Sequence, residues 1–142
     1  MWRQICRLAP RAWALVLEIV VIAVGVEWGL RRLSLPRLLA LLRRLPAQAG
    51  SDGMRPSLEE LQRLTAAVLR RAPFPMTCLK QTLIVFAVLR RRGLPADLKI
   101  GLAKHGDLLQ AHAWIEQDGR VLLDDPDVAQ RFPGVMPLVS YP

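Results

Sequence analysis

The chain has 142 residues, of which 52% are hydrophobic, and it carries a formal net charge of +8. This length predicts one domain, residues 1–142, with enough apolar residues for a substantial core. The charge comes mainly from arginine pairs at the ends of expected helices, which indicates solvated faces. Because aromatic residues are not interleaved with them and no binding module is recognisable, we expect no nucleic-acid partner.

Two cysteines, Cys6 and Cys78, lie far apart in different kinds of segment. Their spacing matches no metal site, and a single disulfide would be unusual in a chain whose sequence looks intracellular. We therefore expect no metal, no cofactor and a cytoplasmic location.

The first expected helix, residues 6–32, is strongly apolar over residues 13–30 and follows several arginines, which is the outline of a signal or membrane helix. Glu18 and Glu27 interrupt the apolar run, and a glutamate near the bilayer centre costs about 2–3 kcal/mol. We expect a helix that is buried or lies on a surface. A membrane anchor and a cleaved signal are the alternatives.

Two more helices are expected before the centre of the chain. Ser34 and Pro36 open one over residues 35–45, so that residues 1–46 form an apolar, helical amino-terminal part. Residues 46–56 have the composition of a loop. Ser57 and Glu60 form a capping box for a helix that extends to residue 71, and residues 57–142 are the expected catalytic core.

The next helix is apolar on nearly every face, which predicts a central, packed position. Thr77 is its expected N-cap, so Cys78 lies in its first turn, and Gly93 and Pro95 end it after residue 92. The hydrophobic period then changes to two. Strands are expected over residues 98–103, 108–116 and 120–125, with a hairpin at Asp118-Gly119. The fold class is therefore α+β, with helices followed by an antiparallel sheet.

Three residue types in this order point to chemistry. A helix amino terminus favours the thiolate form of a cysteine, which is the nucleophilic form, and Cys78 is placed to benefit. Its common alternative role is a small buried hydrophobic residue. His112 lies mid-strand between small residues and faces the same side as Trp114, whereas His105 in the preceding turn is expected to be structural. A cysteine, a histidine and an acid together indicate nucleophilic catalysis.

Hairpin geometry leaves two choices for the acid. If the loop is the two residues Asp118-Gly119, His112 faces Asp125; if a G1 bulge lengthens the loop by one residue, His112 faces Asp124. In either register a carboxylate lies beside the imidazole, as a triad requires.

These residues resemble one family over about residues 73–132. The chain is similar to the transglutaminase-like, papain-like leader peptidases of lasso-peptide biosynthesis in its Cys78-Leu79 pair and in four further segments, residues 89–96, 98–101, 111–116 and 118–121. The resemblance implies a transglutaminase-like fold and a catalytic triad of Cys78, His112 and Asp124. The choice of Asp124 selects the bulged register.

The resemblance also implies a function and partners. The enzyme would remove the leader peptide from a ribosomally made precursor through a thioester intermediate, before a separate lasso cyclase closes the macrolactam. The amino-terminal helices do not look like a leader-recognition domain, so a separate recognition protein is expected, and these helices offer a surface for peripheral membrane contact. The alternatives are a transglutaminase-like acyl transferase and a noncatalytic, membrane-associated adaptor of the same machinery.

Overall fold

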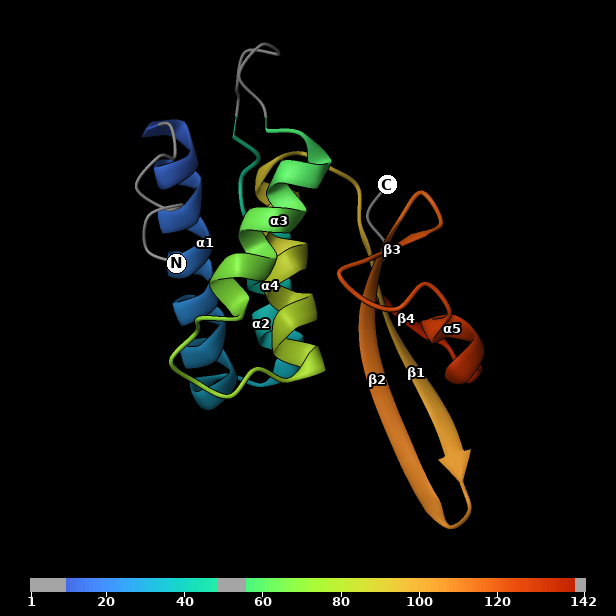
Figure 1. The fold of residues 1–142 in the computed structure, drawn as a ribbon. Helices are drawn as coiled ribbons and strands as arrows, with labels where there is room; N and C mark the ends of the chain where they lie inside the picture. The colour runs from blue at the N-terminus through green and yellow to red at the C-terminus, as the bar shows by residue number, and fades with distance from the viewer. Residues whose placement is uncertain (1–9, 49–55, 140–142) are drawn as a thin grey trace.

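The computed structural model describes residues 10–48 and 56–139 (Figure 1). Four helices come first in the chain and a four-stranded antiparallel sheet follows, which confirms the expected α+β class. The elements are α1 (Pro10–Arg32), α2 (Leu35–Arg43), α3 (Leu58–Leu69), α4 (Cys78–Arg91), β1 (Asp97–His105), β2 (Leu108–Gln117), β3 (Arg120–Leu122), α5 (Val128–Arg131) and β4 (Met136–Val139). The beginning of the first expected helix and Cys6 lie outside the described residues.

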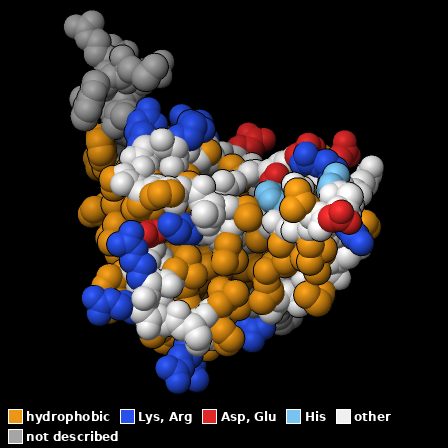
Figure 2. All heavy atoms as spheres, turned by 90° about the horizontal axis from the view of Figure 1, so that it is seen from below, with side chains coloured by type: hydrophobic (Ala, Val, Ile, Leu, Met, Phe, Trp, Pro, Cys, Tyr) orange, Lys and Arg blue, Asp and Glu red, His pale blue; other side chains and the backbone are white. Residues whose placement is uncertain are grey.

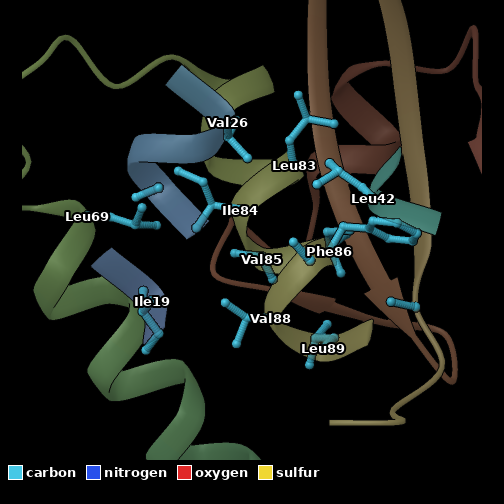
Figure 3. Close-up of a cluster of buried hydrophobic side chains, with 14 of the residues drawn as sticks. Ile19, Val26, Leu42, Leu69, Leu83, Ile84, Val85, Phe86, Val88 and Leu89 are labelled. Carbon is cyan, nitrogen blue, oxygen red and sulfur yellow. The ribbon is translucent and has the colours of Figure 1, made fainter. Parts of the chain in front are cut away.

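Helix α4 is the centre of the hydrophobic core. Its eight consecutive residues 82–89 are all buried, because α1 and α2 pack on one side of it and β1 and β2 on the other. Figure 3 shows side chains of α4 such as Ile84 and Phe86 among apolar side chains from the surrounding helices. A helix that is apolar all round is expected to be enclosed in this way.

Side-chain caps start α3 and α4 where the sequence predicts, whereas Ser34 before α2 makes no side-chain cap hydrogen bond. The Thr77 hydroxyl accepts a hydrogen bond from the Lys80 N–H at 3.3 Å, and the Ser57 hydroxyl accepts one from the Glu60 N–H at 3.1 Å. Such caps satisfy backbone donors that the first helical turn leaves unpaired. At the other end of α4, Gly93 has a φ of 67°, the left-handed conformation typical of a helix stop. Cys78 is thereby fixed as the first residue of α4.

Ion pairs join α1 to both ends of α4. Glu18 accepts hydrogen bonds from Arg91 (2.9 Å) and from Arg92, near the end of α4, and Glu27 lies 2.6 Å from Lys80 in the first turn of α4. The two helices are therefore antiparallel. The interpretation of the arginines as solvated helix-end charges is wrong for these two, because their guanidinium groups are mostly covered and are paired with Glu18.

The sheet has the strand order β3-β2-β1-β4 with antiparallel neighbours throughout (Figure 1). The helices α1 to α4 lie on one side of it and α5 lies on the other. In the long β1–β2 hairpin, Gly101 is paired with His112. Side chains of paired residues point to the same face of a sheet, so the space above Gly101 is next to the His112 ring.

The β2–β3 hairpin has the shorter of the two expected loops. Gln117 pairs with Arg120, and Asp118 and Gly119 have φ values of 50° and 76°, as a two-residue type I′ turn requires. The bulged register selected by the family resemblance is therefore wrong. Strand β3 also ends at Leu122, earlier than residue 125, because the next residue, Leu123, has a φ of 57° and turns the chain out of the ladder.

Candidate active site

His112 and Asp124 form a hydrogen-bonded pair. The Nε2 atom of His112 lies 2.7 Å from Oδ2 of Asp124, and both side chains keep about a quarter of their surface exposed, 26% and 21%. If the observed ladder continued past β3, Asp125 would lie opposite His112. The left-handed backbone of Leu123 ends the ladder first and places Asp124 beside the ring.

Asp125 has a different environment. One of its carboxylate oxygens accepts a hydrogen bond from the Asp127 N–H at 3.1 Å, and the other lies 3.1 Å from the Arg131 guanidinium. These contacts hold the turn that leads into α5. Of the two acids between which the hairpin geometry could not choose, Asp124 is the one in contact with the imidazole.

Cys78 is a partly buried free cysteine at the first position of α4. The N–H groups of Cys78 and Leu79 lie in the first turn of α4, where N–H groups have no acceptor inside the helix. The Thr77 hydroxyl accepts a hydrogen bond from the Lys80 N–H instead. These dipoles favour negative charge on the sulfur. Within the described residues the thiol takes part in no disulfide and in no hydrogen bond, including none with His112.

Two polar side chains of α4 tie the start of this helix to the strands that carry the histidine and the acid. The Thr82 hydroxyl lies 2.7 Å from the Cys78 carbonyl oxygen and 2.9 Å from that of Ala113, the neighbour of His112. The Gln81 amide donates a hydrogen bond of 2.8 Å to the carbonyl of Leu123, the neighbour of Asp124. One helical turn therefore links the backbone next to all three candidate residues.

The position of α4 follows from the short length of β3. Strand β3 pairs only with residues 115–117 of β2, so β2 has no strand neighbour on that side at His112 and Ala113. Backbone groups left unpaired in this way need other partners. Thr82 provides one for Ala113, and this contact brings the amino-terminal end of α4 to the open edge of β2.

Two aromatic rings on the same face of the sheet pack against the His112 imidazole and hold its orientation. The Phe132 ring is stacked at a centroid distance of 5.2 Å with 21° between the planes, and the Trp114 ring lies at 6.4 Å with 19° between the planes. Gly101 makes this packing possible. A Cβ atom at this position would lie 2.5 Å from Phe132 Cβ and 2.8 Å from Trp114 Cη2, closer than carbon atoms can approach.

A partly buried carboxylate supports the Trp114 ring. Glu116 accepts a hydrogen bond from the indole N–H at 2.8 Å and lies 2.5 Å from the Lys99 ammonium. Burial raises the pKa of Glu116, but the hydrogen bonds from Lys99 and Trp114 and the charge of Lys99 outweigh it, so the net pKa is below its usual range. Glu116 is therefore ionised near neutral pH and keeps the indole oriented.

The sequence indicated the three candidate residues but not those that support them. Gln81 and Thr82 were visible as polar exceptions on an apolar helix, whereas nothing in the local pattern singled out Phe132 or α5. His105 is exposed at the β1–β2 turn and takes no part in the site. Among residues 10–48 and 56–139, no group of three or more His, Cys, Asp or Glu side chains is arranged to hold a metal ion.

Figure 2 views the molecule from the end at which α4 begins and the β1–β2 hairpin turns. Hydrophobic side chains spread across this face, with basic side chains at its left and lower margins and His and acidic side chains toward the upper right. A thiol, an imidazole–carboxylate pair and an apolar surface nearby suit a reaction on a peptide-like acyl group.

Comparison with known proteins gives one family. Residues 20–136 match the family model described as the transglutaminase-like superfamily. This range includes α4, the whole β1–β2–β3 region and most of α1. No curated protein and no solved structure matches the chain.

Proposed function

Because the chain belongs to the transglutaminase-like superfamily, which includes cysteine peptidases and acyl transferases, we propose that it is a cysteine peptidase that removes the leader from a lasso-peptide precursor. The observation that supports this most strongly is the 2.7 Å His112–Asp124 pair beside the helix that begins with Cys78. The lasso-peptide substrate class rests on the sequence resemblance of residues 73–132 to the leader peptidases.

The proposed reaction is acyl transfer to sulfur followed by hydrolysis. Asp124 holds Nε2 of His112, so Nδ1 is the ring nitrogen that takes the proton from the Cys78 thiol. The thiolate attacks the scissile carbonyl and a C–S bond forms. The resulting oxyanion is stabilised by the Cys78 N–H at the start of α4. The C–N bond then breaks, and His112 gives its proton to the leaving amine of the core peptide.

Water completes the cycle. His112 takes a proton from a water molecule, the hydroxide attacks the thioester, and the leader leaves with a free carboxylate while the sulfur regains a proton. The thiol–imidazole contact on which this scheme depends is formed when substrate binds, as catalytic hydrogen bonds are often long in unliganded enzymes. The released core has a free amine, which a macrolactam-forming cyclase requires.

The partners proposed are a precursor peptide, a separate leader-recognition protein and a lasso cyclase, all in the cytoplasm. The surface seen in Figure 2 supports a peptide substrate, since hydrophobic side chains lie between basic and acidic margins. Acyl transfer to an amine is the second candidate, because the superfamily includes acyl transferases. A noncatalytic adaptor is the remaining alternative, and it predicts an unreactive Cys78.

Mass spectrometry of precursor incubated with the protein and the recognition protein tests the proposal. We expect Cys78→Ala to abolish cleavage and Asp124→Asn to lower kcat by roughly 10²- to 10⁴-fold. Asp125→Asn is the matched control and should retain activity, because Asp125 contacts the α5 turn rather than His112. Normal cleavage by the Cys78→Ala protein would refute the peptidase, and an amine adduct in place of the free acid would favour the transferase.

A further inference from the structure

Helix α1 has two apolar sides, and only one of them is covered. Its buried residues, including Leu15, Ile19 and Val26, face the core. On the opposite side six large apolar side chains recur at helical spacing and are each 39% to 65% exposed; they are Trp13, Leu17, Val20, Val21, Val24 and Trp28. We call these six the α1 stripe. Only 28% of the most apolar 18-residue window of α1 is buried, and contiguous exposed apolar surface of this kind marks an interaction site.

The α1 stripe carries no acidic group. The acidic residues of α1 are Glu18 and Glu27, and both are paired with α4, through Arg91 and Arg92 at one end and through Lys80 at the other. These glutamates were the reason to expect that α1 does not enter lipid. The structure removes that objection for the exposed side, because both carboxylates are held against the protein.

Basic groups border the same apolar surface. Beside the stripe lies a groove of about 520 Å³ between α1 and α3, lined by apolar residues that include Val20 and Val24. Arg70 and Arg71, at the end of α3, also line it and are exposed, whereas the acidic residues of α3 lie in its first turn, away from the groove. At the end of α1 the Arg32 guanidinium lies 5.4 Å from the centre of the Trp28 ring.

We propose that the α1 stripe is a membrane-docking surface that lies flat on an anionic lipid bilayer. The apolar side chains enter the boundary between headgroups and acyl chains, Trp13 and Trp28 anchor the two ends about 22 Å apart, and the bordering arginines contact lipid phosphates. The arginines beside the stripe and the net charge of +8 favour anionic lipid over a neutral membrane or an uncharged protein surface. The helix lies in the surface and does not cross it, since crossing would separate Glu18 and Glu27 from their cationic partners.

Vesicle sedimentation with the full chain tests this proposal. We expect binding to vesicles of phosphatidylcholine mixed with phosphatidylglycerol, weak binding to phosphatidylcholine alone, and weaker binding as salt is raised. The triple variant Leu17→Gln, Val21→Gln, Val24→Gln should bind at least about tenfold more weakly. Its matched control is Leu108→Gln with Leu109→Gln, because these two residues at the hairpin tip are each 70% exposed but lie far from α1 in the fold; this control should bind as the wild type does.

A second measurement reports contact with lipid directly and leaves the core-facing residues of α1 unchanged. In a Trp2→Phe background, brominated lipids in the vesicles should quench the tryptophan fluorescence, and adding Trp13→Phe with Trp28→Phe should remove most of the quenching, since the remaining tryptophan, Trp114, is 1% exposed. The proposal is overturned if the wild type stays in the supernatant, if both vesicle types bind it equally, or if the hairpin control loses as much binding as the stripe variant. Docking of the recognition protein on the stripe without vesicle binding would also overturn it.

Discussion

Substituting Gly101 by alanine tests how the candidate site is packed. Gly101 is paired with His112, and the space over its Cα is filled by Phe132 and Trp114, the two rings that flank the imidazole. An added Cβ would lie 2.5 Å from Phe132 Cβ, 2.7 Å from the Phe132 carbonyl oxygen and 2.8 Å from Trp114 Cη2. Optimal carbon contacts are about 3.5–4.0 Å, so the backbone at Phe132 must move by roughly 1 Å.

The cost can be estimated from the kind of atoms involved. Overpacking a well-packed site costs about 1–3 kcal/mol. We expect the upper part of this range, because two of the three close atoms belong to the backbone or Cβ of Phe132 and cannot rotate away. For a chain of this length the melting temperature should fall by about 6–12 °C. A shift of Phe132 also displaces the ring stacked on His112, and a misplacement of about 1 Å can reduce kcat by up to about 10²-fold.

Thermal unfolding and precursor cleavage are the two assays. Gly25→Ala is the matched control, because Gly25 lies inside α1 with no atom within 4 Å of the added Cβ. Alanine there should raise stability by about 0.5–1 kcal/mol, the usual gain over glycine within a helix, and should leave cleavage unchanged. If the Gly101→Ala protein melts at the wild-type temperature and cleaves at the wild-type rate, the described packing around His112 is incorrect.

Two further predictions concern the polar contacts of α4. Gln81→Ala removes the 2.8 Å hydrogen bond to the Leu123 carbonyl, so the free energy of unfolding should fall by about 1 kcal/mol and kcat by about tenfold, with KM unchanged. Urea unfolding measures the first effect and steady-state kinetics the second. A rise in KM alone would contradict a positioning role for Gln81. The hydrogen bond from Lys80 lowers the pKa of Glu27 by more than burial raises it, so this pKa lies below its usual value near 4.5. Because the unfolded chain then binds more protons than the folded one, the stability from Glu27 is present above pH 4.5 and is lost as the pH falls through the lowered pKa. The Glu27→Gln protein should therefore be less stable at pH 7, and its melting temperature should fall less steeply between pH 5 and 3 than that of the wild type. Parallel curves of melting temperature against pH for the two proteins would contradict a stabilising Glu27–Lys80 ion pair.

Features that depend on neighbouring residues could be predicted from the sequence. The Thr77 cap, the start of α4 at Cys78 and its stop at Gly93 follow from local hydrogen bonds and backbone preferences. The alternation that places His112 and Trp114 on one face of β2 follows from the two-residue period of a strand. These local rules were enough to propose Cys78 and His112 as the thiol and the imidazole of a candidate site.

Features that depend on distant residues were decided only by the tertiary structure. The two hairpin registers could not be separated locally, and the choice of Asp124 through a bulged loop reached the acid that contacts His112 by an incorrect route. The observed turn has two residues, and the left-handed backbone of Leu123, whose carbonyl is held by Gln81, places Asp124 at the ring. A periodic pattern of hydrophobic residues cannot predict a single residue with a left-handed backbone such as Leu123.

The same holds for α1. Along the sequence, Glu18 and Glu27 are only interruptions in an apolar run, and their effect on a membrane interaction depends on the direction in which they point. Antiparallel packing on α4 pairs both with cations and leaves the opposite side of the helix without an acidic group. The sequence composition determined that α1 is apolar, but packing on α4 determined which side of α1 is covered. The physical reason is that buried charges need partners, and here the partners are distant in the chain: Glu18 and Arg91 are about seventy residues apart, and Glu27 and Lys80 about fifty.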